Sequence, residues 1–203
     1  MQTVGYKSET QNKNLAWFLP RPKPDHYKGG MPLYAEKWLL ELARDLLNKP
    51  DAKILNVFCG MNQQGFRVDL NPKVNPDLLC DIHKLSKFHS EKYDIIFADP
   101  DYSDEEAKQL HDWKLPKINY AKWTSECDKL LNDGGLLVVY HKLVVPNPDS
   151  EKYIVVKRVF IGNRVWHLPR VCIFFKKCSS FDSKSNVSSA TTRNSYVQKP
   201  ASI

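Results

Sequence analysis

The chain has 203 residues, of which 42% are hydrophobic, and this size and composition fit one folded domain with tails. No apolar run approaches the roughly 18 residues that a membrane-spanning helix needs, and the polar N-terminus lacks the apolar centre of a signal peptide. The five cysteines are odd in number and form no CxxC pair, which argues against a zinc site and a disulfide framework. We therefore expect a cytoplasmic protein with reduced, buried thiols and no metal.

The net charge of +7 fits a polyanionic partner such as nucleic acid, although simple solubility would explain it equally well. Residues 1–27 are polar and proline-rich, and we expect them to be flexible. Residues 178–203 are rich in Ser, Thr and Asn and cannot bury enough surface to offset their ordering entropy, so we expect a disordered tail. The folded domain is expected to span residues 28–177.

Helix-like and strand-like patterns alternate within this domain. Residues 31–49 carry apolar side chains at helical spacing and predict a helix. A second helix is predicted to start near residue 103, and a third covers residues 120–135 and ends at a Gly pair. Strands are predicted for the short apolar runs at residues 53–58, 65–72, 77–81, 93–100, 135–145, 151–162 and 170–177. This alternation predicts an α/β protein with a mostly parallel central sheet, and the last two runs predict a hairpin that adds an antiparallel strand.

Three successive predicted strands end in an acid, namely Asp69, Asp81 and Asp99. In a parallel sheet of this type, ligands bind outside the carboxyl ends of the strands. A single acid after a buried strand is often only a helix cap. Three acids at the same edge predict a site for a polar ligand.

The segments at these strand ends resemble the motifs of class I S-adenosylmethionine-dependent methyltransferases. NVFCG, VDLNP and CDIH resemble the three cofactor motifs, and LLNDGGLLVVYHK resembles the Gly-Gly turn and fifth strand. HYKGGMP resembles the segment that meets the methionine end of the cofactor. ADPDYS resembles the (D/N)PP(Y/F) motif of enzymes that methylate amino groups of nucleobases. The resemblance covers residues 28–177 and implies a Rossmann-like methyltransferase fold with S-adenosylmethionine as cofactor.

The resemblance also implies which residues bind the cofactor. Asp69 would hold the ribose hydroxyls, because a carboxylate only accepts hydrogen bonds and a diol donates two. Asp81 would meet the adenine amino group, with Ile82 against the ring. The implied cofactor-binding residues are Lys28, Gly29, Gly30, Phe58, Cys59, Gly60, Asp69, Leu70, Asp81, Ile82 and His83.

The implied catalytic residues are Asp99, Pro100, Asp101 and Tyr102. The Asp99 side chain and the Pro100 carbonyl would accept the hydrogens of an exocyclic amino group and restore its lone pair, while Tyr102 stacks on the base. A base in a duplex would have to be flipped out to reach them. The most direct interpretation is methylation of adenine N6 in DNA or RNA.

Two features depart from the family pattern. Only five residues, Gly60 to Gln64, separate the first strand from Gly65, whereas a parallel crossover normally takes about a dozen. Residues 59–66 fully extended reach about 26 Å, enough to span a strand, so the first crossover helix is predicted to be reduced or absent. Asp101 stands where a proline is usual and adds a negative charge.

Other functions stay open. The protein would be a methyltransferase acting on a small molecule or a protein amine, or a non-catalytic subunit of the same fold that binds nucleic acid or a catalytic partner. A homodimer is a further possibility. Arg164, Trp166, His167 and Arg170 would either grip a phosphate backbone or form a hairpin tip with a buried Trp.

Overall fold

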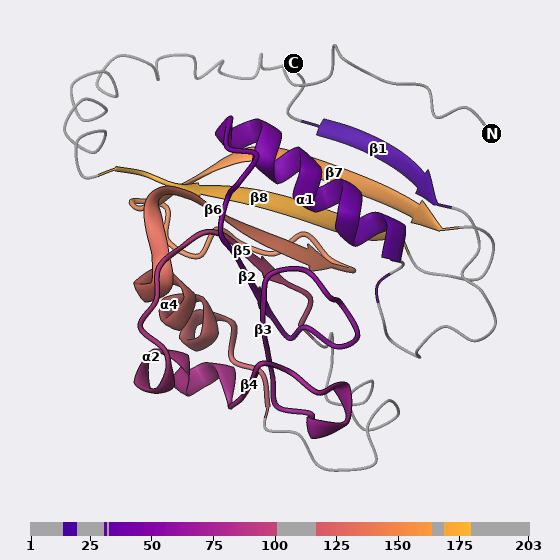
Figure 1. Cartoon of the computed structure of the whole chain (residues 1–203). Helices are drawn as coiled ribbons and strands as arrows, with labels where there is room; N and C mark the ends of the chain where they lie inside the picture. The colour runs from indigo at the N-terminus through magenta and orange to yellow at the C-terminus, as the bar shows by residue number, and fades with distance from the viewer. Residues whose placement is uncertain (1–13, 20–30, 32, 101–116, 164–168, 180–203) are drawn as a thin grey trace, which may run out of the picture.

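The computed structural model describes residues 14–19, 31, 33–100, 117–163 and 169–179, and within them eight strands form one sheet (Figure 1). The strand order across the sheet is β1-β7-β8-β6-β5-β2-β3-β4. The strands are β1 (Asn14–Leu19), β2 (Ile54–Val57), β3 (Phe66–Asp69), β4 (Leu78–Leu79), β5 (Tyr93–Ala98), β6 (Leu131–His141), β7 (Tyr153–Asn163) and β8 (Arg170–Lys177). The helices are α1 (Leu33–Leu47), α2 (Leu85–Phe88) and α4 (Tyr120–Leu130), with the 3-10 turns η2 (Pro72–Val74) and η3 (Ile82–Lys84).

The strand directions confirm the predicted architecture. Strands β2 to β6 are parallel to their neighbours in this group, whereas β8 is antiparallel to both β6 and β7. The final hairpin therefore inserts one reversed strand into a mostly parallel sheet, as expected. The C-terminal ends of β2 to β6 lie along one edge of the sheet, which we call the carboxyl edge.

Strand β1 lies within residues 1–27, which the sequence predicts to be flexible, and at Asn14–Leu19 the structure has a paired strand instead. Asn14–Leu19 pairs in parallel with β7, from Asn14 opposite Arg158 to Leu19 opposite Asn163. Strand β7 has 11 residues and would otherwise leave its outer edge unpaired. The apolar run NLAWFL has the composition of a strand and satisfies that edge.

The crossover from β2 to β3 contains no helix in the structure, as the short spacing predicts. Residues 58–65 connect the parallel strands β2 and β3 as a loop. The next crossover contains only the turn η2, in which the Asn71 side chain accepts a hydrogen bond from the Lys73 N–H. This half of the sheet is therefore covered by loops where α/β proteins usually place helices.

The end of α4 differs from the prediction. The helix ends at Leu130 rather than at Gly134-Gly135, and β6 begins at once with Leu131. Tyr93 pairs with Leu131 but Ile95 pairs with Leu136, so the Gly pair lies in an irregularity of β6. A Cβ on Gly135 would lie 2.8 Å from the Asp94 carbonyl oxygen. Gly135 therefore permits close approach of β6 to β5, and the Gly pair does not end the helix.

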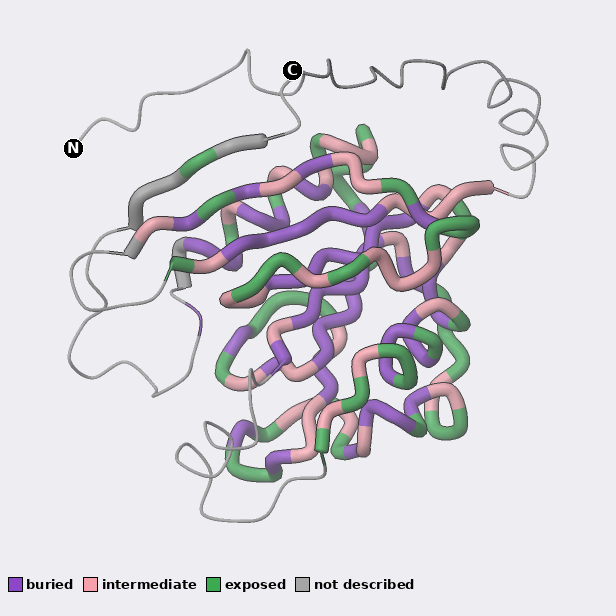
Figure 2. The backbone as a smooth tube through the Cα atoms, turned by 180° about the vertical axis from the view of Figure 1, so that it is seen from behind, coloured by how far each residue is buried: buried purple, intermediate pink, exposed green. Residues whose placement is uncertain are grey.

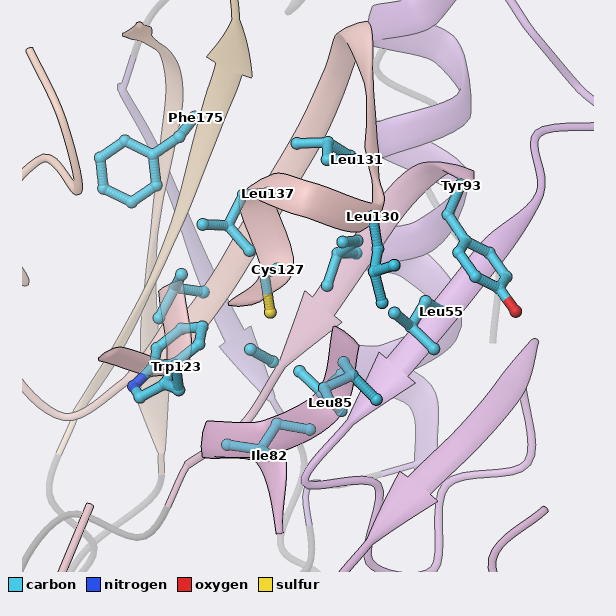
Figure 3. Packing of buried hydrophobic residues seen from close by; sticks show 14 of the residues in the cluster. Leu55, Ile82, Leu85, Tyr93, Trp123, Cys127, Leu130, Leu131, Leu137 and Phe175 are labelled. Atoms are coloured by element: carbon cyan, nitrogen blue, oxygen red, sulfur yellow. The ribbon is translucent and has the colours of Figure 1, made fainter. Parts of the chain in front are cut away.

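The hydrophobic core has two layers, one on each face of the sheet. On one face, Leu39, Leu40 and Ala43 of α1 pack against strand residues that include Phe97 and Phe174. On the other, α2, α4 and η3 cover the sheet through residues that include Leu85, Trp123, Cys127 and Leu130 (Figure 3). Figure 2 shows that the central strands are the most continuously buried part of the backbone. Burying each large apolar side chain contributes about 1.5–3 kcal/mol, so these layers dominate the stability.

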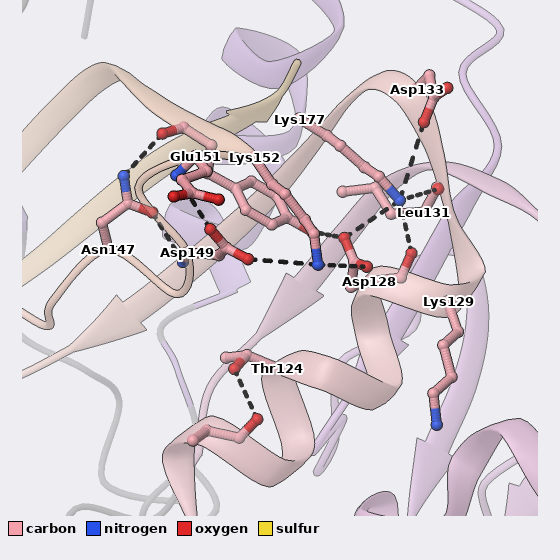
Figure 4. Close-up of polar contacts among 12 residues, drawn as sticks. Thr124, Asp128, Lys129, Leu131, Asp133, Asn147, Asp149, Glu151, Lys152 and Lys177 are labelled. Carbon is pink, nitrogen blue, oxygen red and sulfur yellow. Dashed lines mark hydrogen bonds and ion pairs between the residues drawn. The ribbon is translucent and has the colours of Figure 1, made fainter. Parts of the chain in front are cut away.

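The C-terminal end of α4 is tied to the far end of the hairpin by Lys177 (Figure 4). Its ammonium group donates to the carbonyl oxygens of Asp128 at 2.8 Å and Leu131 at 3.2 Å, and it lies 3.1 Å from the Asp128 carboxylate. The Tyr153 hydroxyl donates to the same carboxylate at 2.9 Å. The last carbonyls of a helix have no partner within the helix, so this lysine satisfies groups that would otherwise need water.

All five cysteines are free thiols, and four of them are buried. No helix in the described part of the chain combines the length and apolar character that crossing a membrane requires. Among the same residues, no cluster of three or more His, Cys, Asp or Glu side chains has the arrangement of a metal site.

Candidate functional site

The carboxyl edge brings together the three acids that the sequence singles out. Asp69 is the last residue of β3, Asp81 immediately precedes η3 after β4, and Asp99 follows β5. Since β5, β2, β3 and β4 are consecutive neighbours in the sheet, these side chains line one continuous stretch of its edge. All three are partly exposed, so a ligand can reach them.

Asp69 connects the ends of β2 and β3. One carboxylate oxygen accepts a hydrogen bond from the Gly60 N–H at 2.9 Å, and the other accepts from the Asn71 N–H at 2.8 Å. Gly60 has a φ of +50°, in the left-handed region that favours glycine, and a Cβ at this position would meet no atom within 4 Å. The backbone at Gly60 thus faces open space beside a carboxylate.

Asp81 belongs to a chain of hydrogen bonds that joins η3 to α4. Its carboxylate oxygen Oδ1 accepts from the His83 N–H at 3.0 Å and contacts His83 Nδ1 at 2.8 Å, while His83 Nε2 accepts from the Asn119 N–H at 3.0 Å. Nε2 is therefore the acceptor nitrogen and Nδ1 carries the proton. Burial acts to raise the pKa of Asp81, but the bonds from His83 outweigh it and lower this pKa. The histidine orients the acid and caps the neighbouring helix, rather than facing a ligand with a free nitrogen.

The remaining cofactor candidates on the described chain differ in exposure, from buried to half-buried. Ile82 and Cys59 are 4% and 1% exposed, and Ile82 packs in the core beneath α4. Burial raises the pKa of the Cys59 thiol to about 12, so it is not a nucleophile at neutral pH. Leu70 is half-buried at the end of β3. Phe58 has a φ of +55° and places its ring edge-on to Trp123, with centroids 5.6 Å apart.

Asp99 lies near Tyr140 of β6 and Arg170 of β8. Burial raises the pKa of the Tyr140 hydroxyl, the negative charge of Asp99 raises it further, and Arg170 lowers it. Asp99 also adds to the effect of burial in raising the pKa of Cys172. Pro100 follows Asp99 and is buried. The first residue after β5 thus carries a partly exposed carboxylate, which lies among the ends of β5, β6 and β8.

Several predicted residues lie outside the described part of the chain. Among the catalytic candidates these are Asp101 and Tyr102, and among the cofactor candidates they are Lys28, Gly29 and Gly30. Arg164, Trp166 and His167 of the loop between the last strands, and the helix predicted from residue 103, also lie outside it. Their roles stay predictions.

Arg67 organises the same edge, although the sequence reasoning does not single it out. It is 8% exposed on β3, and its guanidinium donates to four carbonyl oxygens of the two flanking loops. The bonds run to Asn62 O at 2.6 Å, Asn75 O at 2.8 Å, Val74 O at 2.8 Å and Gly60 O at 3.2 Å. The sequence signal for this role was an arginine between apolar residues of a short strand. Such an arginine is buried, and a buried guanidinium requires several hydrogen-bond acceptors nearby.

Glu36 of α1 is the second residue that the sequence reasoning missed. It is 3% exposed, and its carboxylate accepts a hydrogen bond from Asn56 Nδ2 at 2.9 Å. Its position in the sequence carried a signal, because Glu36 shares the spacing of the buried Leu39, Leu40 and Ala43 on the apolar face of the helix. An acid on that face has to find a polar partner inside the protein.

No protein-family model matches the chain, and no curated protein matches its sequence. Its fold does match solved structures. TrmN from Thermus thermophilus superposes with a TM-score of 0.52 at 16% identity, over 72% of this chain and 49% of that chain. The N-methyltransferase NodS from Bradyrhizobium japonicum WM9 matches with a TM-score of 0.50 at 16% identity, over 73% of this chain and 98% of that chain. NodS in complex with S-adenosyl-l-homocysteine matches with a TM-score of 0.50 at 15% identity, over 72% of this chain and 87% of that chain.

The chain has a methyltransferase fold. The identities of 15–16% limit the likeness to the fold. The chain spans about half the length of the TrmN structure, so the match concerns only part of that protein. The expected Rossmann-like methyltransferase architecture is thereby confirmed.

Proposed function

We propose that the protein is an S-adenosylmethionine-dependent methyltransferase that transfers a methyl group to an exocyclic amino group, namely adenine N6 in DNA or RNA. The observation that carries the proposal is the row of acids Asp69, Asp81 and Asp99 along the carboxyl edge of a methyltransferase-fold sheet. This is the edge at which α/β sheets bind their ligands.

Three observations support binding of the cofactor by the described residues. The open space at Gly60 admits a ligand close to the backbone. Each oxygen of Asp69 accepts one backbone N–H, and a carboxylate has about four acceptor sites, so the diol of a ribose can still be held. At Asp81 both hydrogen bonds from His83 go to Oδ1, so Oδ2 faces none of these donors and suits an amino group.

When bound, the cofactor supplies an activated methyl group on a sulfonium, and the protein mainly has to position the acceptor and exclude water. The Asp99 carboxylate would accept a hydrogen of the target amine, and the Pro100 carbonyl would accept the other. Both groups lie just after the end of β5. Strand β5 is the neighbour of β2 in the sheet, and the proposed cofactor loop follows β2. In this proposal Tyr102 stacks on the base.

The substrate proposal is supported by chemistry and charge. Amide-like exocyclic amines are poor nucleophiles, and acceptors such as Asp99 and the following carbonyl localise their lone pair. The net charge of +7 favours a polyanion over a neutral small molecule. With 203 residues, the chain would take its sequence specificity from short loops or from a partner.

The test is titration calorimetry of the purified chain with S-adenosylmethionine and S-adenosylhomocysteine, followed by a labelled-methyl assay on DNA, RNA and small amines. Asp99→Ala should abolish methyl transfer and leave cofactor affinity within about twofold, because Asp99 faces the acceptor. Full turnover of this variant at saturating cofactor would remove Asp99 from the reaction. Methylation of small amines would favour another amine substrate, if the affinity for nucleic acid also does not change with salt concentration.

One observation favours a non-catalytic subunit as a second candidate. Both oxygens of Asp69 already accept backbone hydrogen bonds, so this acid has a structural role even without a ligand. This candidate predicts no cofactor binding at millimolar concentration, together with retained binding to nucleic acid or to a catalytic partner.

A further inference from the structure

A buried polar cluster joins α1 to the loop between β2 and β3. Glu36 and Asn56 are 3% and 0% exposed, and Asn56 Nδ2 donates to Glu36 Oε1 at 2.9 Å and to the Gln64 carbonyl oxygen at 3.4 Å. The Gln63 and Gln64 backbones also lie close enough to the Glu36 carboxylate to act to lower its pKa. One carboxylate on a helix therefore contacts both the strand β2 and the loop that follows it.

This loop is held from a second direction by Arg67, through the carbonyl oxygens of Gly60 and Asn62. Its first part also contains the Gly60 N–H that donates to Asp69. Loop residues 58–65 take the place of a crossover helix, so no helical hydrogen bonds determine their course. Side chains from α1 and β3 take over that task.

We propose that Glu36 is a positioning residue for the cofactor-binding edge, whose carboxylate holds the β2–β3 loop so that Gly60 and Asp69 are presented to the ligand. This inference rests on the proposed function, since it concerns the same edge. Glu36 itself does not touch the ligand in this proposal.

The two protonation states of Glu36 differ in how they bind the loop. A carboxylate accepts from Asn56 and is favoured by the nearby Gln63 and Gln64 backbones, whereas a carboxylic acid uses one oxygen as a donor and needs an acceptor for it. The buried Asn56 Oδ1 has no hydrogen-bond partner and would become that acceptor if the amide turned over. The turned amide would no longer donate to the Gln64 carbonyl, so protonation removes this hold on the loop while Glu36 itself stays buried, unlike in global unfolding.

The balance between these states falls near neutral pH. Burial raises the pKa of Glu36 to about 7, although Asn56, Gln64, Arg67 and Gln63 each act to lower it. Arg67 on β3 is the charged group, among the described residues, that acts on Glu36 from the packed elements. Asp81 and His83 follow β4 and pack toward α4, on the opposite face of the sheet from α1. Substitution at residue 36 therefore tests the pH effect of Glu36 without disturbing the Asp81–His83 contact.

The experiment measures S-adenosylhomocysteine affinity between pH 6 and pH 8 for the wild-type chain, Glu36→Gln and the control Glu41→Gln. Glu41 lies on the same helix with a side chain that is 53% exposed, and it pairs only with Lys37 at 4.0 Å in the described contacts. We expect wild type and Glu41→Gln to bind about fivefold more tightly at pH 8, a typical coupling between two sites. Glu36→Gln should show a flat profile near the weaker limit.

Hydrogen exchange gives a readout that needs neither cofactor nor variant. Protection factors of the Gln63 and Gln64 amides in the wild-type chain, corrected for intrinsic pH dependence, should rise from pH 6 to pH 8. Protection factors that do not change would overturn the role of Glu36, whatever the binding result. An unchanged pH slope in Glu36→Gln would overturn it as well. Absence of cofactor binding in all three proteins, with the exchange effect present, would refute the proposed function but support the hold of Glu36 on the loop.

Discussion

The two halves of the sheet are covered in different ways. Around β5, β6 and β8, the helix α4 buries Trp123, Cys127 and Leu130, and the cover is held by apolar contact. Around β2 and β3, loops replace the crossover helices. On the α1 face these loops are held in place by hydrogen bonds of Arg67, Glu36 and Asn56. The candidate site lies along the carboxyl edge shared by both halves.

This difference shows what a chain needs when it omits a crossover helix. A helix satisfies its own backbone groups, whereas a loop laid on a sheet leaves carbonyl and N–H groups that must be satisfied from outside. A guanidinium with five donors and a carboxylate with several acceptor sites supply these bonds compactly. The loop-covered half is thus more sensitive to pH and charge, and the helix-covered half is more sensitive to volume.

The largest effect is expected in the helix-covered half. Trp123→Ala removes a fully buried ring that packs edge-on to Phe58 and Tyr120, and it should lower the free energy of unfolding by about 3–5 kcal/mol. Trp123→Phe is the matched control, because the buried Trp123 Nε1 has no hydrogen-bond partner to lose. Chemical denaturation measures both. A cost below 1 kcal/mol for Trp123→Ala would contradict the apolar account of this half.

The corresponding change in the loop-covered half is Arg67→Leu. It keeps the site filled but leaves the Asn62, Val74, Asn75 and Gly60 carbonyls without their donor, which should cost about 2–4 kcal/mol. Arg67→Lys keeps the charge with fewer, differently placed donors and should recover part of the loss. Denaturation at pH 7 gives the stabilities. Equal stability of Arg67→Leu and wild type would mean that water replaces the guanidinium without cost.

At the shared edge, Asp81→Ala should weaken S-adenosylhomocysteine binding about tenfold, in line with the loss of one charge-assisted hydrogen bond. It should also cost about 1 kcal/mol of stability, since Asp81 caps η3 by accepting from the His83 N–H. Asp81→Asn keeps the cap oxygen and separates the two effects. Calorimetry and denaturation are the measurements, and unchanged affinity in Asp81→Ala would remove this residue from the site.

A further effect of similar size is the pH dependence of stability in the loop-covered half. The folded protein raises the pKa of Glu36 from 4.5 to about 7, so folding favours the protonated form. The stabilisation from the neutral acid is fully present below pH 4.5 and is lost as pH rises through about 7. Relative to Glu36→Gln, wild type should lose about 1–2 kcal/mol between pH 5 and pH 8. Thermal unfolding of both proteins across this pH range measures the loss. Stability that changes with pH in the same way in wild type and Glu36→Gln would contradict the prediction.

Much of the architecture was predictable because it depends on local patterns. The apolar runs located the central strands, and the five residues from Gly60 to Gln64 predicted a reduced or absent crossover helix, because an extended loop of this length can span a strand. The acids at Asp69, Asp81 and Asp99 followed from the rule that parallel strands place their ends at one edge. The end of α4 was misjudged because a Gly pair serves close strand packing as well as a helix stop.

The sequence by itself therefore determined the sheet, its reversed strand and the edge at which the acids gather, because periodicity and strand order need only neighbouring residues. Only the tertiary structure decided that Asn14–Leu19 pairs with β7 and that His83 hydrogen-bonds to both Asp81 and Asn119. It also decided that Arg67 and Glu36 hold the β2–β3 loop. Apart from the local contact of His83 with Asp81, each of these contacts joins groups that are separated along the chain or lie on different elements. The burial that makes a polar contact necessary appears only once the chain has folded.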